Sequence, residues 1–111
     1  MAKPALPFPT ELELKILNII WSGDGKGTTV RTVRDALAKS GKNVAYNTVL
    51  TMMTIMTRKG HLKRKTDKTG LRHAYVAKAA QAATRKGMLR DIVERTYGGN
   101  AAEAIKDLQE K

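Results

Sequence analysis

The sequence predicts a mainly α-helical fold that carries one small β-ribbon. Apolar residues recur with the helical period of 3.6 over residues 11–59. The period changes to 2 over residues 62–76 and returns to 3.6 in the last third of the chain. With 111 residues, we expect one domain with a modest core and at most a small appended element.

The first helix is expected over residues 11–21. Thr10 and Glu13 have the spacing of a capping box, in which each side chain accepts a hydrogen bond from the backbone of the other residue. The apolar side chains of this helix gather near one face: Leu12, Ile16, Leu17, Ile19, Ile20 and Trp21. Residues 1–9 contain the three prolines of the chain, and we expect a loosely ordered, flexible arm there.

The second helix is expected over residues 30–39, with Thr28 or Thr29 as its N-terminal cap. Gly41 ends it, because glycine adopts the positive φ that commonly follows a helix. Its apolar stripe consists of Val30, Val33 and Leu37. We expect this stripe to pack into the core.

The third helix is expected over residues 45–59 and ends at Gly60. Its core stripe follows the spacing i, i+3, i+4, i+7 and consists of Val49, Met52, Met53 and Met56. The methionines are interpreted as adaptable core residues rather than as metal ligands. The opposite face of the helix is left for polar residues.

A β-ribbon is expected directly after the third helix. Residues 62–66 and 71–76 alternate in the manner of strands, and residues 67–70 form the turn between them. Three helices followed by a basic two-stranded ribbon are the outline of a winged helix-turn-helix, expected to span residues 10–78.

Residues 79–111 are expected to form a helical dimerisation segment. One helix spans residues 79–97, and Asn100 caps a second. The apolar residues proposed for dimerisation are Met88, Leu89, Ile92, Val93, Tyr97, Ala104, Ile105 and Leu108. Two short amphipathic helices have little of their own to pack against, which favours a second copy of the chain. The alternative is that they fold back on the first domain.

Charge is concentrated in the middle of the chain. The net charge is +11, and residues 43–78 alone contain eight basic residues and one acidic residue. A localised basic patch favours a polyanionic partner, with nucleic acid ahead of a membrane surface. The alternative is a solvated face that aids solubility.

The third helix supplies the candidates for reading DNA bases. A helix fits the major groove of B-DNA, and outward side chains near its N-terminus meet base edges. Asn47 can pair with adenine through two hydrogen bonds, and Leu50 can pack against a thymine methyl group. The base-reading candidates are Tyr46, Asn47, Thr48, Leu50 and Thr51.

A second set of residues is suited to the DNA backbone. Basic and hydroxyl side chains contact phosphates and position a protein on the duplex, and each neutralised phosphate makes binding more sensitive to salt. The backbone candidates are Thr29, Arg31, Arg34, Lys42, Thr54, Arg58, Lys63, Arg64, Lys65, Lys68 and Arg72.

Catalysis and cofactor binding find little support. The two histidines, His61 and His73, lack acidic neighbours at ligand spacing, and the chain contains no cysteine, so no metal or cofactor is expected. No acid–base or nucleophile set is visible, so we expect no enzyme. The sequence has neither a signal peptide nor an apolar run long enough to span a membrane, and we expect a cytoplasmic protein.

The sequence resembles the penicillinase repressor (BlaI/MecI/CopY) family of bacterial transcriptional regulators. Four segments carry the resemblance: TELELKILNIIW at residues 10–21, TTVRTVRDAL at 28–37, AYNTVLT at 45–51 with RKGHLKR at 58–64, and YGGN at 97–100. Together they cover roughly residues 10–108. The combination is fairly specific, although each segment alone is a weak signal.

The resemblance implies a homodimeric repressor on a double-stranded DNA operator of inverted symmetry. It implies that Tyr46, Asn47, Thr48 and Thr51 face DNA. It also implies release through a membrane sensor-protease system that leads to cleavage of the repressor at an Asn-Phe bond. The chain departs there, because the corresponding position falls near Asp107–Leu108. It also lacks the cysteine pairs of the copper-responsive members.

The sequence leaves two alternatives to a sequence-specific repressor. A non-specific nucleic-acid-binding protein would share the charge but needs no base-reading side chains. A protein-interaction module would use its charge only for solubility. Binding to a specific DNA site in competition with other DNA separates the first alternative from the repressor, since a specific protein prefers its site by at least ~10³.

Overall fold

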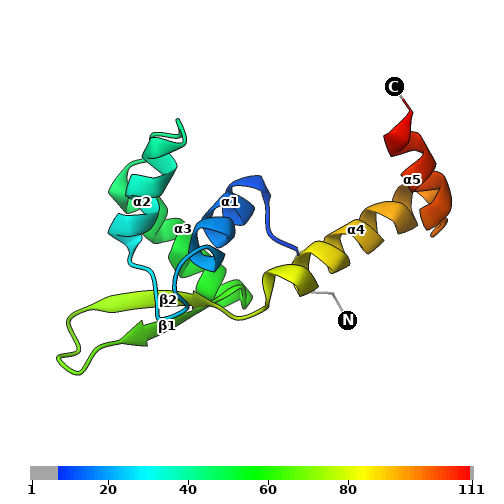
Figure 1. Ribbon diagram of the computed structural model, residues 1–111. Coiled ribbons are helices and arrows are strands. Elements are labelled where there is room, and N and C mark those ends of the chain that lie inside the picture. The colour runs from blue at the N-terminus through cyan, green and yellow to red at the C-terminus, as the bar shows by residue number, and fades with distance from the viewer. Residues whose placement is uncertain (1–7, 111) are drawn as a thin grey trace. The chain divides into compact units, whose positions relative to one another are not determined.

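The computed structural model describes residues 8–110 and is shown in Figure 1. Residues 1–7 of the expected arm lie outside the described residues. The elements follow the order α1 (Glu11–Trp21), α2 (Val30–Lys39), α3 (Tyr46–Lys59), β1 (Leu62–Thr66), β2 (His73–Ala77), α4 (Gln81–Tyr97) and α5 (Ala101–Gln109). This order confirms the predicted fold class, a mainly helical winged helix-turn-helix followed by further helices.

The chain forms two compact units, Met1–Ala80 and Gln81–Lys111. The first contains α1–α3 and the hairpin of β1 and β2, and it encloses the hydrophobic core. The core residues are Ile16, Leu17, Ile20, Val30, Val33, Leu37, Val49, Met53, Met56, Leu62 and Tyr75. Met52, predicted to be core, is half-buried and packs against this cluster. Three helices and the base of the hairpin therefore share one core.

The capping box at the start of α1 is present, and it continues into an ion pair. The backbone N–H of Thr10 donates to Glu13 Oε1 at 2.9 Å, and the backbone N–H of Glu13 donates to the Thr10 hydroxyl at 3.4 Å. Glu13 is only 5% exposed, and Lys59 Nζ donates to both of its carboxylate oxygens at 3.0 and 3.1 Å. The first turn of α1 is thereby joined to the last turn of α3.

Helices α2 and α3 end as the sequence predicts. Thr29, rather than Thr28, caps α2, and its hydroxyl accepts a hydrogen bond from the backbone N–H of Thr32 at 3.1 Å. Gly41 and Gly60 follow the two helices with φ values of 94° and 92°. These left-handed conformations turn the chain out of each helix at little cost only because the residue is glycine.

The hairpin is antiparallel, with Arg64 opposite Tyr75 and Lys65 opposite Ala74. The predicted start of the second strand at residue 71 is wrong, because β2 begins at His73. The Asp67 carboxylate accepts hydrogen bonds from backbone N–H groups of the turn, including that of Gly70 at 3.1 Å. These bonds hold residues 67–72 in a loop, which forms the tip of the hairpin in Figure 1.

A third backbone segment pairs with the hairpin. Thr28 and Tyr75 exchange two backbone hydrogen bonds of 2.9 Å, so residue 28 lies along the edge of β2 that faces away from β1. Gly27 precedes this bridge with a φ of 133°, and a Cβ built on it would lie 2.7 Å from the Cβ of Ala74. A glycine is therefore required at this approach.

The second unit consists of α4 and α5. Helix α4 begins at Gln81, two residues later than predicted, because Lys78 still extends the hairpin by donating its N–H to His61 at 3.1 Å. The Ala79 carbonyl then accepts a hydrogen bond from the Trp21 indole at 2.9 Å. Asn100 caps α5 as predicted, since its side chain accepts a hydrogen bond from the Glu103 N–H at 3.0 Å.

Candidate nucleic-acid interface

The outward face of α3 is polar. Val49, Met53 and Met56 are fully buried, which turns the opposite side of the helix to solvent. That side carries Asn47, Thr51, Thr54 and Arg58, spaced i, i+4, i+7 and i+11, and all four are exposed. The remaining base-reading candidates, Tyr46, Thr48 and Leu50, flank this line and are also exposed.

The polar groups on α3 differ in whether they are free to bind a ligand. The hydroxyl of Thr54 donates to the Leu50 carbonyl at 2.8 Å, so it can only accept a hydrogen bond from a ligand. Within residues 8–110, the side chains of Asn47, Thr48 and Thr51 make no hydrogen bond. Their donors and acceptors remain available near the N-terminal half of the helix, where base contacts are made in helix-turn-helix proteins.

The backbone candidates on α2 and at its two ends are less uniform than the sequence suggested. Arg31 and Lys42 are exposed. Arg34 is held by Asp35, whose Oδ1 accepts hydrogen bonds of 3.2 and 2.9 Å from its guanidinium, so part of its charge is compensated. The Thr29 hydroxyl serves the α2 cap, which leaves a smaller role for it at a phosphate.

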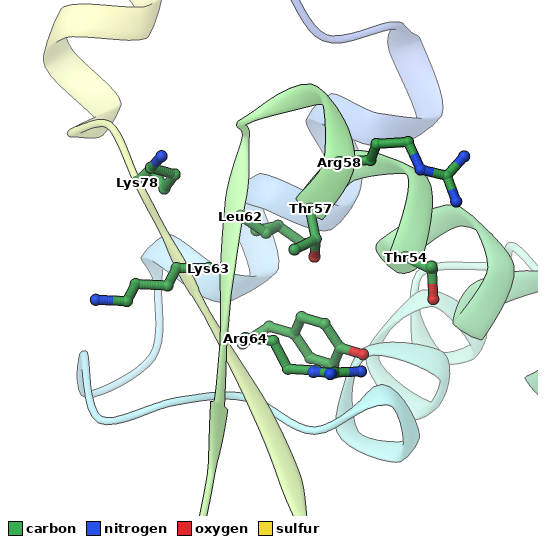
Figure 2. Close-up of a pocket in the computed structure, with 8 residues that line it drawn as sticks. Thr54, Thr57, Arg58, Leu62, Lys63, Arg64 and Lys78 are labelled. Carbon is green, nitrogen blue, oxygen red and sulfur yellow. The ribbon is translucent and has the colours of Figure 1, made fainter.

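The cations of the hairpin fall on two opposite faces. Side chains alternate along a strand, and residues paired across two strands share a face. Arg64 therefore lies on the same face as Tyr75, the core side, whereas Lys63 and Lys65 lie on the other. Figure 2 shows the side chains of Lys63 and Arg64 leaving β1 in opposite directions. Lys68 and Arg72 are exposed in the loop at the hairpin tip.

A groove lies between the C-terminal half of α3 and β1, and Figure 2 shows the residues around it. It is open to solvent and has a volume of about 620 Å³. Its lining residues are Thr54, Thr57, Arg58, Leu62, Lys63, Arg64, Tyr75 and Lys78. Four of these are cations and none is a carboxylate. The structure thus brings Arg58, Lys63 and Arg64 of the predicted backbone set to one depression.

Thr57, Tyr75 and Lys78 were missed by the sequence analysis. Lys78 lies in the basic segment of residues 43–78, so charge alone gave a signal for it. Tyr75 falls within the second expected strand, but its place in the groove beside α3 depends on the register of the hairpin. Thr57 is half-buried, and its hydroxyl donates to the Met53 carbonyl at 2.8 Å.

A buried polar cluster supports α3 from the core side. Burial alone would raise the pKa of Glu13, but the hydrogen bond from the Thr10 backbone and the Lys59 ammonium hold that pKa below its ordinary value. Burial lowers the pKa of His61, although the Glu13 carboxylate opposes this. His61 Nε2 is buried without a hydrogen-bond partner, 4.0 Å from Glu13 Oε1. The side chains of Glu13 and His61 are largely shielded from solvent, and the arrangement fits a structural part.

The dimerisation candidates divide into exposed and engaged residues. Leu89, Ile92, Ile105 and Leu108 are 62%, 49%, 53% and 82% exposed. Met88 and Val93 are half-buried, while Ala104 is buried within the second unit. The Tyr97 hydroxyl donates to the Asp107 carboxylate at 2.7 Å, and this bond raises the Tyr97 pKa. Tyr97 and Ala104 therefore already serve the packing of α4 against α5.

Residues 8–110 offer neither a metal site nor a membrane-spanning helix. No group of three or more histidine, cysteine or carboxylate side chains could hold a metal ion there. In the same range, no helix combines the length and the apolar character needed to cross a membrane. The charged groove and the polar face of α3 are the features to which a ligand can be assigned.

The comparison with known families agrees with this geometry. The family model described as penicillinase repressor matches residues 9–111, which is nearly the whole chain. A search of the curated proteins found no match. Proteins of this family are transcription regulators and not enzymes. The chain therefore belongs to the penicillinase repressor family and is a DNA-binding transcriptional repressor.

Proposed function

We propose that the protein represses transcription as a homodimer that binds an inverted-repeat operator in a sequence-specific manner. The observation that carries this proposal is the free polar line on α3. Asn47 and Thr51 project from the side opposite the core, and no bond within the described residues occupies their side chains. Unbonded polar side chains on the exposed face of α3, on the same helix as the cationic groove, are what binding to DNA requires.

The base contacts follow from the chemistry of these side chains. The Asn47 amide matches the N6 and N7 positions of adenine, which together distinguish an A·T pair in the major groove. Thr48 and Thr51 can bond a base edge or a phosphate, and Leu50 supplies an apolar surface for a thymine methyl group. Arg31 and Lys42 would contact the backbone beside α3 and fix the register of the helix.

The second unit supports a dimer. Among its described residues, 81–110, Ala104 is the only buried hydrophobic side chain, and α4 contributes no buried residue. Leu89 and Ile92 are three residues apart on α4, and Ile105 and Leu108 are three apart on α5, so each pair lies on one helix face. A two-fold partner would cover these faces. It would place the two α3 helices about one DNA turn, ~34 Å, apart.

Selection of bound duplexes from a random pool tests the proposal. The expected result is an inverted repeat with a two-fold symmetric footprint. The variant Asn47→Ala should weaken binding to the selected site by about 1–3 kcal/mol and leave non-specific binding nearly unchanged. Ile55→Ala, at a position of α3 that is 38% exposed and belongs to neither candidate set, is the matched control and should leave both kinds of binding unchanged. Equal losses on selected and random DNA would remove Asn47 from base reading.

A non-specific nucleic-acid-binding protein is the second candidate function. It is favoured by the basic residues of the groove, which contact phosphates without reading sequence. Competition between a selected duplex and random DNA at physiological salt decides between the two. A preference below about tenfold would favour the second candidate, because specific proteins typically prefer their site by 10³ or more.

The proposal also covers the cellular location of the protein and the partner that releases it from DNA. Binding to a bacterial operator implies a cytoplasmic location. A membrane sensor-protease system is proposed from the family resemblance alone. Asp107 and Leu108 lie within α5, so cleavage between them would require that helix to open. Intact protein after incubation with the activated sensor pathway would argue against release by proteolysis.

A further inference from the structure

The groove between α3 and β1 offers oxyanion ligands more than general electrostatic attraction. Arg58 projects from α3 and Arg64 from β1, and both line the depression. Within residues 8–110, neither side chain takes part in an ion pair or a hydrogen bond. Their guanidinium donors are therefore available in full. Arginine suits such a site because its planar fork can bond two oxygens of one anion.

Tyr75 provides a buried donor in the same groove. The residue is 2% exposed, yet within the described residues its hydroxyl has no hydrogen-bond partner. The hydroxyl oxygen is not fully buried, so it reaches the surface of the groove while the ring of Tyr75 lies in the core. A tyrosine hydroxyl with this placement can donate to an anion without any change in the core.

The strand edge adds a backbone donor. The main-chain N–H and C=O of Tyr75 are bonded to Thr28, so they point away from β1. Arg64, which faces Tyr75, therefore directs its own N–H away from β2, toward the unpaired outer edge of β1. This N–H has no hydrogen-bond partner within residues 8–110. The edge of β1 thus presents a backbone donor and a guanidinium from a single residue.

The other lining residues contribute less. The hydroxyls of Thr54 and Thr57 already donate to carbonyls of their own helix, so they cannot donate to an anion. Lys63 and Lys78 lie on the side of β1 away from Arg58 and Thr54 in Figure 2, where they add positive charge to the rim. The site is consequently built on Arg58, Arg64 and the Tyr75 hydroxyl.

We propose that this groove seats one phosphoryl group, bound by Arg58, Arg64 and Tyr75. The favoured source is a duplex backbone, and this part rests on the proposed function. If α3 occupies a major groove and the hairpin reaches the adjacent minor groove, the sugar-phosphate strand between those two grooves must cross between α3 and β1. A free phosphorylated molecule would satisfy the same donors.

The first experiment scans phosphates one at a time. Duplexes selected by the protein carry a single neutral methylphosphonate at each backbone position, and affinities are measured for the wild type, Arg64→Gln and Tyr75→Phe. In the wild type, one position in each half-site should weaken binding about tenfold, as expected for a charge-assisted hydrogen bond. In Arg64→Gln the same modification should cost less than about twofold, because the partner is already lost.

Lys15→Gln is the matched control. It also removes one positive charge, but Lys15 is exposed on α1 and belongs to neither the groove nor the backbone candidates. It should lower overall affinity at most modestly and preserve the wild-type response at the critical phosphate. Thermal unfolding of each variant at one protomer concentration shows whether any loss of binding comes from loss of fold.

The second experiment uses inorganic phosphate and no DNA, so it can be interpreted even if the protein selects no duplex. Phosphate is titrated into the full chain at constant ionic strength, and amide shifts in two-dimensional NMR are compared with a chloride titration. Saturable shifts at Arg64 and Tyr75 that vanish in Arg64→Gln would support the seat with a free anion as its source. If no single phosphate is coupled to Arg64 and phosphate acts like chloride, the proposal is overturned.

Discussion

At the scale of single residues, Glu13 connects the start of α1 to the end of α3. Its backbone N–H and side chain complete the cap of α1, and its carboxylate holds Lys59 at the end of α3. Local spacing predicted the cap, because Thr10 is only three residues away. It could not predict Lys59, which is 46 residues distant and becomes a neighbour only when α1 packs beside α3.

Because the side chain of His61 is largely buried, we expect the folded protein to lose stability in mild acid. Its pKa is lowered by burial, so the unfolded chain binds a proton at a higher pH than the folded protein does. Stability should therefore fall as the pH drops below the ordinary histidine value of 6.5. His61→Phe removes this titration, and its free energy of unfolding should change less between pH 7 and pH 5.5. Urea unfolding at each pH measures the difference.

Glu13 adds a second phase at lower pH: its pKa is also lowered, so its stabilisation is complete above about 4.5 and is lost as the pH falls through its folded value. Identical pH profiles for the wild type and His61→Phe would contradict the assignment.

At the scale of elements, the hairpin depends on the segment before α2. Thr28 bonds to Tyr75 through two backbone hydrogen bonds, and Gly27 passes against Ala74 with a positive φ. The loop of residues 22–27 is therefore a support for the hairpin as well as a link between helices. A change in that loop should be transmitted to the position of Arg64 beside α3.

Gly27→Ala tests this support. The added methyl group would meet the Ala74 Cβ at 2.7 Å in a backbone conformation that alanine rarely adopts, so we expect a loss of at least about 2 kcal/mol in unfolding free energy. Gly25→Ala is the matched control, since Gly25 also has a positive φ but no atom lies within 4 Å of the added group. It should cost about 1 kcal/mol. Equal losses in urea unfolding would show that the contact with Ala74 is unimportant.

The elements also show where sequence reasoning succeeds and where it fails. The apolar pattern and Gly60 predicted both ends of β1 and the end of α3 to the residue, because they mark these ends locally. The predicted start of α3 at residue 45 is one residue early, because Ala45 is the N-terminal cap and the helix begins at Tyr46. The start of β2 was missed because the Asp67 side chain organises the turn out to Arg72. The strand period places Lys63 and Lys65 on one face and Arg64 on the other. A prediction from charge alone groups the three residues together and does not show this division.

At the scale of the whole molecule, the second unit is the part with the least core of its own. The candidate site could be predicted as a set of residue types on α3, because burial of one stripe exposes the opposite one. The groove could not, because it requires the register of β1 against β2 and the packing of both against α3. Such pairings join residues that are far apart in the chain, and local sequence patterns do not predict which of these residues meet.

Leu89→Gln tests the proposed dimer. The side chain is 62% exposed within one chain, so the replacement should barely affect the monomer. In a dimer that buries it, the dissociation constant should rise by at least about tenfold. Arg90→Gln, the next residue on α4 and also exposed, is the control. Sedimentation over a range of protomer concentrations measures both. An unchanged oligomeric state in Leu89→Gln would exclude this face from the interface.

The hydrogen bond from the Trp21 indole to the Ala79 carbonyl gives the protein a built-in optical reporter. Trp21 is the only tryptophan in the chain, so its emission can be read without a label. The bond lies where the chain leaves the hairpin, and a shift in emission colour would register any loosening at that exit. Fluorescence recorded during a DNA titration would then show whether DNA binding at α3 and the hairpin changes the surroundings of Trp21.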